Sequence, residues 1–270
     1  MRKLETYSHY KEQNNENKER TNCTGSPDNH IRGSRDCSNK RDPVHSGISA
    51  GYYRNDNTKH ERTMKRTVKN RTDKQITNSL RSYLSAATKD EWELGRAWYK
   101  EAQYFVNETY KAYAGNIPGL TPYKVAGVVS ALSPNNRWER NKLDTITVLK
   151  AVAIDIAPEN VKVCTYNANK LKAFEIARGN TDITVKSPKT HSFAMNVGLN
   201  SPDHITIDKW HLRACVTEAG EGIQDCMEKC TAAQYRRIES ITAELAHQHG
   251  LNGYEAQAII WVTIKRIWNR

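Results

Sequence analysis

Apolar residues recur at helical spacing from about residue 76 to the end of the chain, whereas the first 75 residues show no such period. Ile76, Leu80 and Leu84 are the first side chains that fall on one helical face. A short β-branched run at residues 181–185 has no evident partner strand, and we interpret it as a connector. The pattern predicts an all-α domain of roughly eight to ten helices. The predicted helices cover residues 76–84, 88–113, 121–132, 137–156, 166–178, 188–197, 208–216, 232–249 and 254–268.

Several of these helices begin or end at residues that favour a cap. Thr88 and Glu91 have the spacing of a capping box, in which each side chain satisfies a backbone N–H at the helix start. Thr121 and Pro122 fit a cap followed by a first-turn proline. Gly115 is placed to end the preceding helix in a left-handed conformation.

The apolar pattern also predicts which helix faces are buried. Residues 125–132 are almost wholly apolar, which predicts a helix buried all round. We interpret the aromatic residues of the helix over 88–113 as core rather than as a platform for stacking bases. The helix over 137–156 offers the following apolar side chains to its inner face: Leu143, Ile146, Val148, Leu149, Val152 and Ile156.

The first 75 residues differ in composition from the rest. They hold 17 Lys+Arg and 10 Asp+Glu, so +7 of the chain's net charge of +11 lies there. Only 14 of them are apolar, too few to bury a core that offsets the entropy of ordering the chain. We therefore predict a disordered basic arm over residues 1–75 and an all-α domain over residues 76–270. The basic cluster at residues 62–71 has two interpretations, contact with phosphates or a solvated linker.

The net charge of +11 suits a polyanionic partner, although a basic protein without such a partner has the same balance. The six cysteines are scattered, no secretory leader starts the chain, and no apolar run approaches the length of a membrane span. We expect a soluble protein with reduced thiols in the cytoplasm, which is the host's cytoplasm if a phage encodes it. No glycine loop for a dinucleotide or a nucleoside triphosphate appears, so nucleotide-hydrolysing and redox functions have no support.

Two residues with catalytic potential lie within residues 187–213. Lys189 opens a short apolar helix, and Asp208 follows Ile-Thr-Ile and precedes Trp-His-Leu-Arg. A carboxylate at a helix start can stabilise positive charge on an oxocarbenium-like sugar, or take a proton from an attacking group. Aspartate is also a preferred N-cap, and a lysine at a helix start can contact a phosphate. From the residues alone, both interpretations stay open.

Three segments carry motifs that form a recognisable series. Residues 128–136, followed by Asn141, have an apolar helix that ends in Leu-Ser-Pro-Asn-Asn. Residues 166–173 start a helix with Tyr-Asn-Ala-Asn-Lys, and residues 188–190 and 207–213 read Pro-Lys-Thr and Ile-Asp-Lys-Trp-His-Leu-Arg. In order and spacing, this series resembles the helix-hairpin-helix DNA glycosylases (the HhH-GPD superfamily) of the endonuclease III type.

This resemblance implies a helix-hairpin-helix glycosylase-like fold and assigns roles to three residues. Asp208 matches the aspartate that assists departure of the base or activates the nucleophile. Lys189 matches the lysine that attacks the sugar C1′ in bifunctional members, where a water-poor pocket lowers an amine's pKa; contact with a phosphate is the alternative. Asn135 stands where the family inserts a side chain into the gap left by a flipped nucleotide.

Other residues are candidates for contact with the same substrate. Trp138 can stack on a base or fill core, and Gln257 can face a ligand or be a satisfied core glutamine. His211 matches a histidine that is more often structural than catalytic, and Arg213 is a candidate for DNA or for an acid or backbone carbonyls. The predicted substrate-binding residues are Asn135, Trp138, Asn141, Trp210, His211 and Gln257. The predicted DNA-backbone contacts are Lys186, Ser187, Thr190 and Arg213.

The chain departs from the family in three places. The hairpin run at residues 184–188 has no glycine, so phosphate contact there would come from side chains rather than from backbone N–H groups. Cys215, Cys226 and Cys230 do not reproduce the four-cysteine iron–sulfur spacing or a zinc site, so we predict no metal and no cofactor. Residues 250–262 resemble uncharacterised phage proteins instead, which indicates a divergent, phage-type member.

We therefore expect a monomeric enzyme that acts on a flipped, modified base in duplex DNA and cleaves its N-glycosidic bond. One alternative keeps the fold but transfers a group to a modified thymine during phage DNA hypermodification. A second alternative is a non-catalytic DNA-binding protein in which Asp208 is only a cap and the basic arm supplies affinity.

Overall fold

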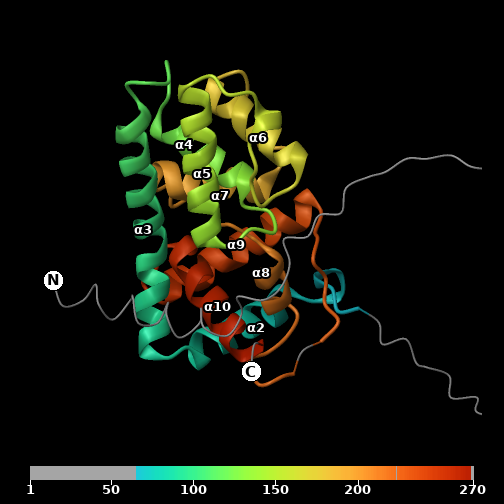
Figure 1. Cartoon of the computed structure of the whole chain (residues 1–270). Helices are drawn as coiled ribbons and strands as arrows, with labels where there is room; N and C mark the ends of the chain where they lie inside the picture. Colours follow the sequence, from blue (N-terminus) through green and yellow to red (C-terminus); the bar gives the residue numbers. More distant parts are fainter. Residues whose placement is uncertain (1–64, 223, 269–270) are drawn as a thin grey trace, which may run out of the picture. The chain divides into compact units, whose positions relative to one another are not determined.

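The computed structural model describes residues 65–222 and 224–268, and nine α-helices lie within these ranges (Figure 1). The described residues contain no β-strand, only an isolated bridge between Arg66 and Cys226. The predicted all-α class is thus confirmed for this part of the chain. The helices are α2 (Asp73–Ala86), α3 (Lys89–Tyr113), α4 (Pro122–Leu132), α5 (Trp138–Ala153), α6 (Asn167–Arg178), α7 (Pro188–Leu199), α8 (Lys209–Ala214), α9 (Ala232–Gln248) and α10 (Gly253–Trp268), with 3-10 turns η1 (Val68–Asn70) and η2 (Pro158–Asn160).

Two apolar cores are buried within the described residues, which belong to one unit spanning residues 59–270. The first, here called the α4 core, includes Val125, Val129, Leu132, Leu149, Phe174 and Val197 from α4 to α7. The second, the α9 core, includes Leu80, Leu84, Leu212, Ile238 and Leu245 from α2, α8 and α9. Figure 1 shows α3 running alongside both groups of helices.

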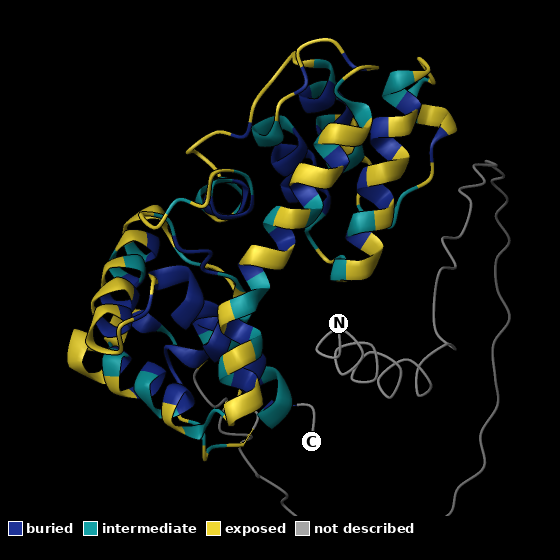
Figure 2. Cartoon of the chain, turned by 90° about the vertical axis from the view of Figure 1, so that its left-hand side faces the viewer, coloured by how far each residue is buried: buried dark blue, intermediate teal, exposed yellow. Residues whose placement is uncertain are grey.

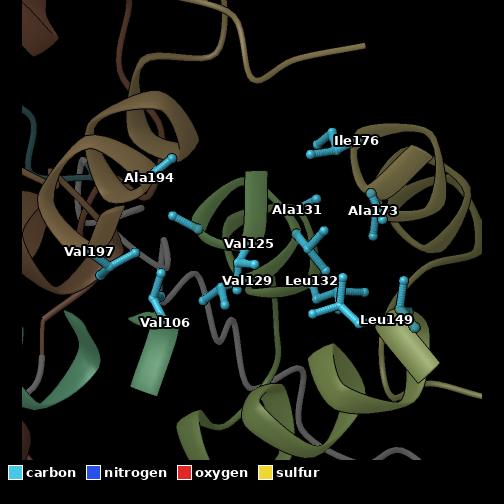
Figure 3. Packing of buried hydrophobic residues seen from close by; sticks show 14 of the residues in the cluster. Val106, Val125, Val129, Ala131, Leu132, Leu149, Ala173, Ile176, Ala194 and Val197 are labelled. Atoms are coloured by element: carbon cyan, nitrogen blue, oxygen red, sulfur yellow. The ribbon is translucent and has the colours of Figure 1, made fainter. Parts of the chain in front are cut away.

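Helix α4 lies at the centre of its core, as its sequence predicts. Every residue from Val125 to Leu132 is buried. Figure 3 shows the side chains of Val125, Val129 and Leu132 surrounded by residues of α3, α5, α6 and α7. Four neighbouring helices therefore cover α4, which explains why it lacks the polar face of an ordinary surface helix.

Helices α3 and α10 contribute to both cores and hold them together. Trp92 packs against the α9 core, whereas Tyr99, Ala102 and Val106 lie in the α4 core. Helix α10 is buried along most of its length, while most of the other helices expose one side (Figure 2). Where the two helices meet, a Cβ atom at Gly95 would lie 2.4 Å from a side-chain carbon of Ile259 and 2.7 Å from its Cα. Glycine at this position therefore allows the two backbones to approach closely.

Predicted caps agree with the structure at most helix starts. Thr88 and Glu91 form the expected capping box, and Thr121 accepts a hydrogen bond from the backbone N–H of Lys124. The prediction for Gly115 is wrong. Helix α3 ends at a right-handed Ala114, and the left-handed turn comes later, at Gly119.

Part of the predicted inner face of α5 points outward instead. Leu143 is 58% exposed, and Ile146 and Ile156 are each 37% exposed. The buried face of α5 includes polar Asn141 and Asp144. These polar side chains bond to backbone groups of α4 and of the loop before α6, so the rotation of α5 follows its hydrogen bonds rather than its apolar residues alone.

The ordered domain begins before the boundary expected at residue 76. Val68 is fully buried in the α9 core, and α2 starts at Asp73 behind a Thr72 cap. Arg66 donates a hydrogen bond to Glu221 at 2.7 Å, so part of the basic cluster at residues 62–71 is paired within the protein. Most of the predicted basic arm, residues 1–64, lies outside the described residues.

Substitution Gly95→Ala is expected to lower the free energy of unfolding by about 3 kcal/mol, because the added methyl group meets backbone atoms that cannot move alone. Chemical denaturation of the purified variant measures the change. Gly115→Ala is the matched control, since nothing lies within 4 Å of a Cβ at that position. Equal midpoints for the two variants would contradict the close packing of α3 against α10.

Candidate functional site

Asp208 follows residues 205–207, which belong to no helix or strand and are held in place by side chains. Tyr235 of α9 donates a hydrogen bond to the carbonyl of Ile205 at 2.7 Å and accepts one from the N–H of Ile207 at 3.0 Å. The N–H of Ile205 donates to a carboxylate oxygen of Glu239 at 2.9 Å. Because no strand in the described part of the chain pairs with residues 205–207, these side chains satisfy the buried backbone groups and so hold Asp208 in position.

Asn196 ties the same segment to α7. Its side chain donates to the carbonyls of Ser201 and His204 at 3.1 and 2.7 Å, and accepts from the Thr206 hydroxyl at 3.0 Å. Asn196 is fully buried, and its bond with the Thr206 hydroxyl is buried as well. The helix that carries Lys189 is thereby connected to the segment that carries Asp208.

Asp208 caps α8, and its carboxyl group lies in an unusual electrostatic environment. One carboxylate oxygen accepts the backbone N–H of His211 at 2.9 Å. Desolvation raises the pKa of the Asp208 carboxyl above its ordinary 3.8, although hydrogen bonds from His211 and Trp210 and the charges of Lys189 and Lys265 act in the opposite direction. The predicted cap is confirmed, and both lysines act electrostatically on the carboxyl group.

Lys265 also acts on the Asp208 carboxyl, although it is not among the residues predicted from the sequence. Gln257, Trp261 and Lys265 follow one another at four-residue spacing, so they share one face of α10. The Lys265 Nζ lies 4.1 Å from the centroid of the Trp261 ring. Desolvation lowers the pKa of the Lys265 ammonium; Asp208 opposes this shift and Arg137 adds to it. The spacing from Gln257 was the one sequence signal that pointed to this lysine.

An aromatic cluster lies beside these charges and is defined by Trp98, Trp138, Phe193 and Trp261, from α3, α5, α7 and α10. The Trp98 ring centroid lies 5.3 Å from that of Trp138 and 6.1 Å from those of Phe193 and Trp261. Phe193 is buried, whereas the three tryptophans are partly exposed. Together, Asp208, Lys189, Lys265 and this aromatic cluster form what we call the Asp208 site.

The predicted backbone contacts at the start of α7 have mixed environments. Lys186, Ser187 and Lys189 are exposed, and Ser187 makes no side-chain cap bond. Thr190 instead donates its hydroxyl to the carbonyl of Ser187 at 3.0 Å, and its own carbonyl accepts the Ser130 hydroxyl at 2.6 Å. The α7 start thus presents two lysines to solvent and is anchored to α4 by Thr190.

The loop between α4 and α5 is shaped by two asparagines. Asn135 is exposed, has a positive φ of 57°, and donates to the Tyr166 hydroxyl at 2.8 Å. Asn136 donates to Asp144 at 2.9 Å, and the same carboxylate accepts the backbone N–H of Cys164 at 2.9 Å. Asp144 therefore holds two loops, and Asn135 stays at the exposed tip between them.

Three predicted substrate contacts are buried and bonded within the protein. Asn141 donates to the carbonyl of Val129 at 3.0 Å, and Gln257 accepts the Tyr99 hydroxyl at 2.8 Å. The His211 Nε2 lies 2.9 Å from the Thr242 hydroxyl, which itself donates to the carbonyl of Ile238. His211 must therefore be the donor to Thr242. These positions give the three side chains structural roles. The side-chain amide oxygen of Asn141 has no hydrogen-bond partner.

Trp210 and Arg213 belong to a separate contact. The Arg213 guanidinium carbon lies 4.7 Å from the Trp210 ring centroid and 5.4 Å from that of Trp268. Arg213 also pairs with Glu228 at 2.5 Å. Arg213 is thus paired with an acid, which was one of the two interpretations from the sequence. Its position gives no support to the other interpretation, contact with the DNA backbone.

Within residues 65–222 and 224–268, no group of three or more His, Cys, Asp or Glu side chains is arranged to hold a metal ion. The cysteines Cys215, Cys226 and Cys230 carry free thiols. Among the described helices, none combines the length and apolar character needed to cross a membrane.

Comparison with known proteins identifies one family. Residues 62–267 match a family described as a family of unknown function (DUF7178). The chain belongs to this family. No curated protein and no solved structure matches the chain. The DUF7178 match includes every residue of the Asp208 site and all of both cores except Trp268, so the site lies within the part that defines the family.

Substitution Tyr235→Phe is expected to cost about 1–3 kcal/mol of unfolding free energy, because it leaves the carbonyl of Ile205 and the N–H of Ile207 buried without partners. Thermal and urea denaturation measure the loss. Tyr104→Phe is the control, since Tyr104 is 69% exposed. If both variants unfold like the wild type, Tyr235 does not hold this segment.

Burial lowers the pKa of His211 to about 3. A histidine with a lowered folded-state pKa stabilises the protein above its unfolded pKa of about 6.5, and that stability is lost as pH falls from there towards 3. Between these pH values, the free energy of unfolding of the wild type should fall by up to about 1.4 kcal/mol per pH unit more than that of His211→Gln. Glutamine is a suitable replacement because its amide can still donate to Thr242. Urea denaturation across this pH range compares the slopes, and parallel slopes would contradict a buried neutral His211.

Proposed function

We propose that the chain is a DNA base-processing enzyme that acts on a flipped base and cleaves its N-glycosidic bond, with Asp208 at the reacting sugar. The observation that carries this proposal is the environment of the Asp208 carboxyl group. This group is desolvated at a helix start and feels the positive charges of Lys189 and Lys265, and the aromatic cluster lies beside these charges. A carboxylate, amines and flat rings are the groups needed to bind and cleave a nucleoside.

Asp208 has the chemistry for the central step. As a carboxylate it stabilises positive charge on the sugar as the base departs, or takes a proton from the attacking water. Its environment holds the carboxyl pKa above the ordinary value, which strengthens it as a proton acceptor. Its cap bond to His211 fixes the orientation of the side chain.

The helix-hairpin-helix glycosylase-like fold is part of the proposal and has support from contacts among the three motifs. Asn135 of the first motif bonds to Tyr166 of the second. The Ser130 hydroxyl, also in the first motif, bonds to the carbonyl of Thr190 in the third. Lys189 acts electrostatically on Asp208. Motifs separated along the chain are thus neighbours in space, which favours a common function.

The aromatic cluster and the start of α7 suit the two parts of a nucleic acid. The partly exposed rings of Trp138 and Trp261 can stack on an extruded base, and exposed Asn135 can fill the gap that it leaves. Lys186 and Lys189 can contact the phosphates on either side. A single chain supplies all of these groups, so we propose that the enzyme acts as a monomer on duplex DNA.

Substitution Asp208→Asn separates catalysis from capping, because asparagine caps a helix as well as aspartate does. The raised carboxyl pKa means that ionisation of Asp208 costs stability above its unfolded pKa, so the variant should be at least as stable as the wild type at neutral pH. Activity should fall by at least about 100-fold. Thermal unfolding and assays of duplexes that carry modified bases measure the two effects.

The matched control is Asp203→Asn, which removes an exposed carboxylate five positions earlier. Abasic product from the wild type and the control, but not from Asp208→Asn, supports base excision. Mass spectrometry of the treated DNA distinguishes excision from transfer of a group to the base. Binding of DNA without either product, and unchanged by Asp208→Asn, would overturn the enzyme proposal in favour of a binding protein.

A further inference from the structure

We infer that Lys265, and not Lys189, is the reactive amine of the Asp208 site, and that it forms an imine with an aldehyde carbon of the substrate. The nature of that substrate rests on the proposed function, because an abasic deoxyribose in its open form carries an aldehyde at C1′. The identification of Lys265 as the reactive amine rests on its position in the structure.

Lys265 lies on α10, near a ring of its own helix and under the influence of charged groups from two other elements. Trp261, one turn earlier on α10, places its ring 4.1 Å from the Lys265 Nζ. Asp208 of α8 and Arg137 from the start of α5 are the charged groups that act on this nitrogen. An aromatic face and a partly buried carboxyl therefore replace much of the water that surrounds an ordinary lysine.

This environment favours the neutral amine, which is the nucleophilic form. Desolvation lowers the pKa of Lys265, and the positive charge of Arg137 adds to that effect. The negative charge of Asp208 opposes it without outweighing it. Asp208 thus acts electrostatically on Lys265, whose own proton is held less tightly than that of an ordinary lysine.

Lys189 has a different setting that suits a different role. It is the second residue of α7 and is exposed, next to the exposed side chains of Lys186 and Ser187. A lysine in this position suits an anion such as a phosphate rather than a carbon centre. Lys265 is therefore the reactive amine and Lys189 the phosphate contact, two roles that the sequence resemblance offers for Lys189 alone.

The reaction is a condensation that needs no further reagent. The neutral Lys265 nitrogen attacks the aldehyde carbon, so that an N–C bond forms and the electron pair of the C=O bond moves to the oxygen. The Asp208 carboxylate carries one proton from the nitrogen to that oxygen, which becomes a hydroxyl group, and then carries the second nitrogen proton to the hydroxyl. The C–O bond then breaks, water leaves, and the C=N bond of the imine remains.

Reductive methylation with formaldehyde and cyanoborohydride tests the amine without DNA. Peptide mapping by mass spectrometry follows the labelling of each lysine as a function of pH. The labelling midpoint of Lys265 should lie at lower pH than that of Lys189 or of exposed Lys100. Because burial slows labelling at every pH, the midpoint and not the rate is the decisive quantity.

Two substitutions should move that midpoint in opposite directions. Asp208→Asn removes the negative charge and should shift it to lower pH, whereas Arg137→Gln removes a positive charge and should shift it to higher pH. Shifts in the same direction, or a wild-type midpoint equal to that of Lys100, would overturn the inference. Thermal unfolding of each variant confirms that the compared proteins are folded.

Borohydride trapping on a duplex with an abasic site then tests the substrate. The adduct should map to Lys265, disappear in Lys265→Arg and persist in Lys189→Arg. An adduct on Lys189 overturns the inference. If Lys265 labels with formaldehyde as expected but no lysine traps the abasic duplex, the reactive amine stands and the result counts against the DNA substrate of the proposed function.

Discussion

The backbones of α3 and α10 meet at Gly95, and most of what surrounds the Asp208 site depends on this contact. The same pair of helices brings Tyr99 to Gln257 and Trp98 to Trp261. It also joins the two apolar cores, since residues of α3 and α10 lie in each of them. A bulkier residue at Gly95 would separate the helices and so alter the distance between the aromatic cluster and the charged side chains.

Buried polar side chains position the site more than regular secondary structure does. Residues 205–207 belong to no helix or strand, so Tyr235, Glu239 and Asn196 supply hydrogen bonds to this segment. Asp144 likewise accepts hydrogen bonds from the loops on either side of α5. Each arrangement is costly to disturb, because a lost partner leaves a buried group unsatisfied.

Within the site, the effect of burial outweighs the attraction between opposite charges. The pKa of Asp208 is raised and that of Lys265 is lowered, although each group favours the charged form of the other. Both shifts therefore reduce the charge carried by the pair, as expected where little water reaches. A carboxyl group with a raised pKa and an amine with a lowered pKa suit the proposed chemistry at a sugar.

By itself, the sequence determined the features that depend on near neighbours along the chain. Helical period, the capping box of Thr88 and Glu91, the apolar run in α4 and the cap at Asp208 all involve groups a few residues apart. Tertiary structure alone decided the rotation of α5, the pairing of Arg213 with Glu228, and the environment of Lys265. These features arise from desolvation and from partners on distant elements, which no local pattern records.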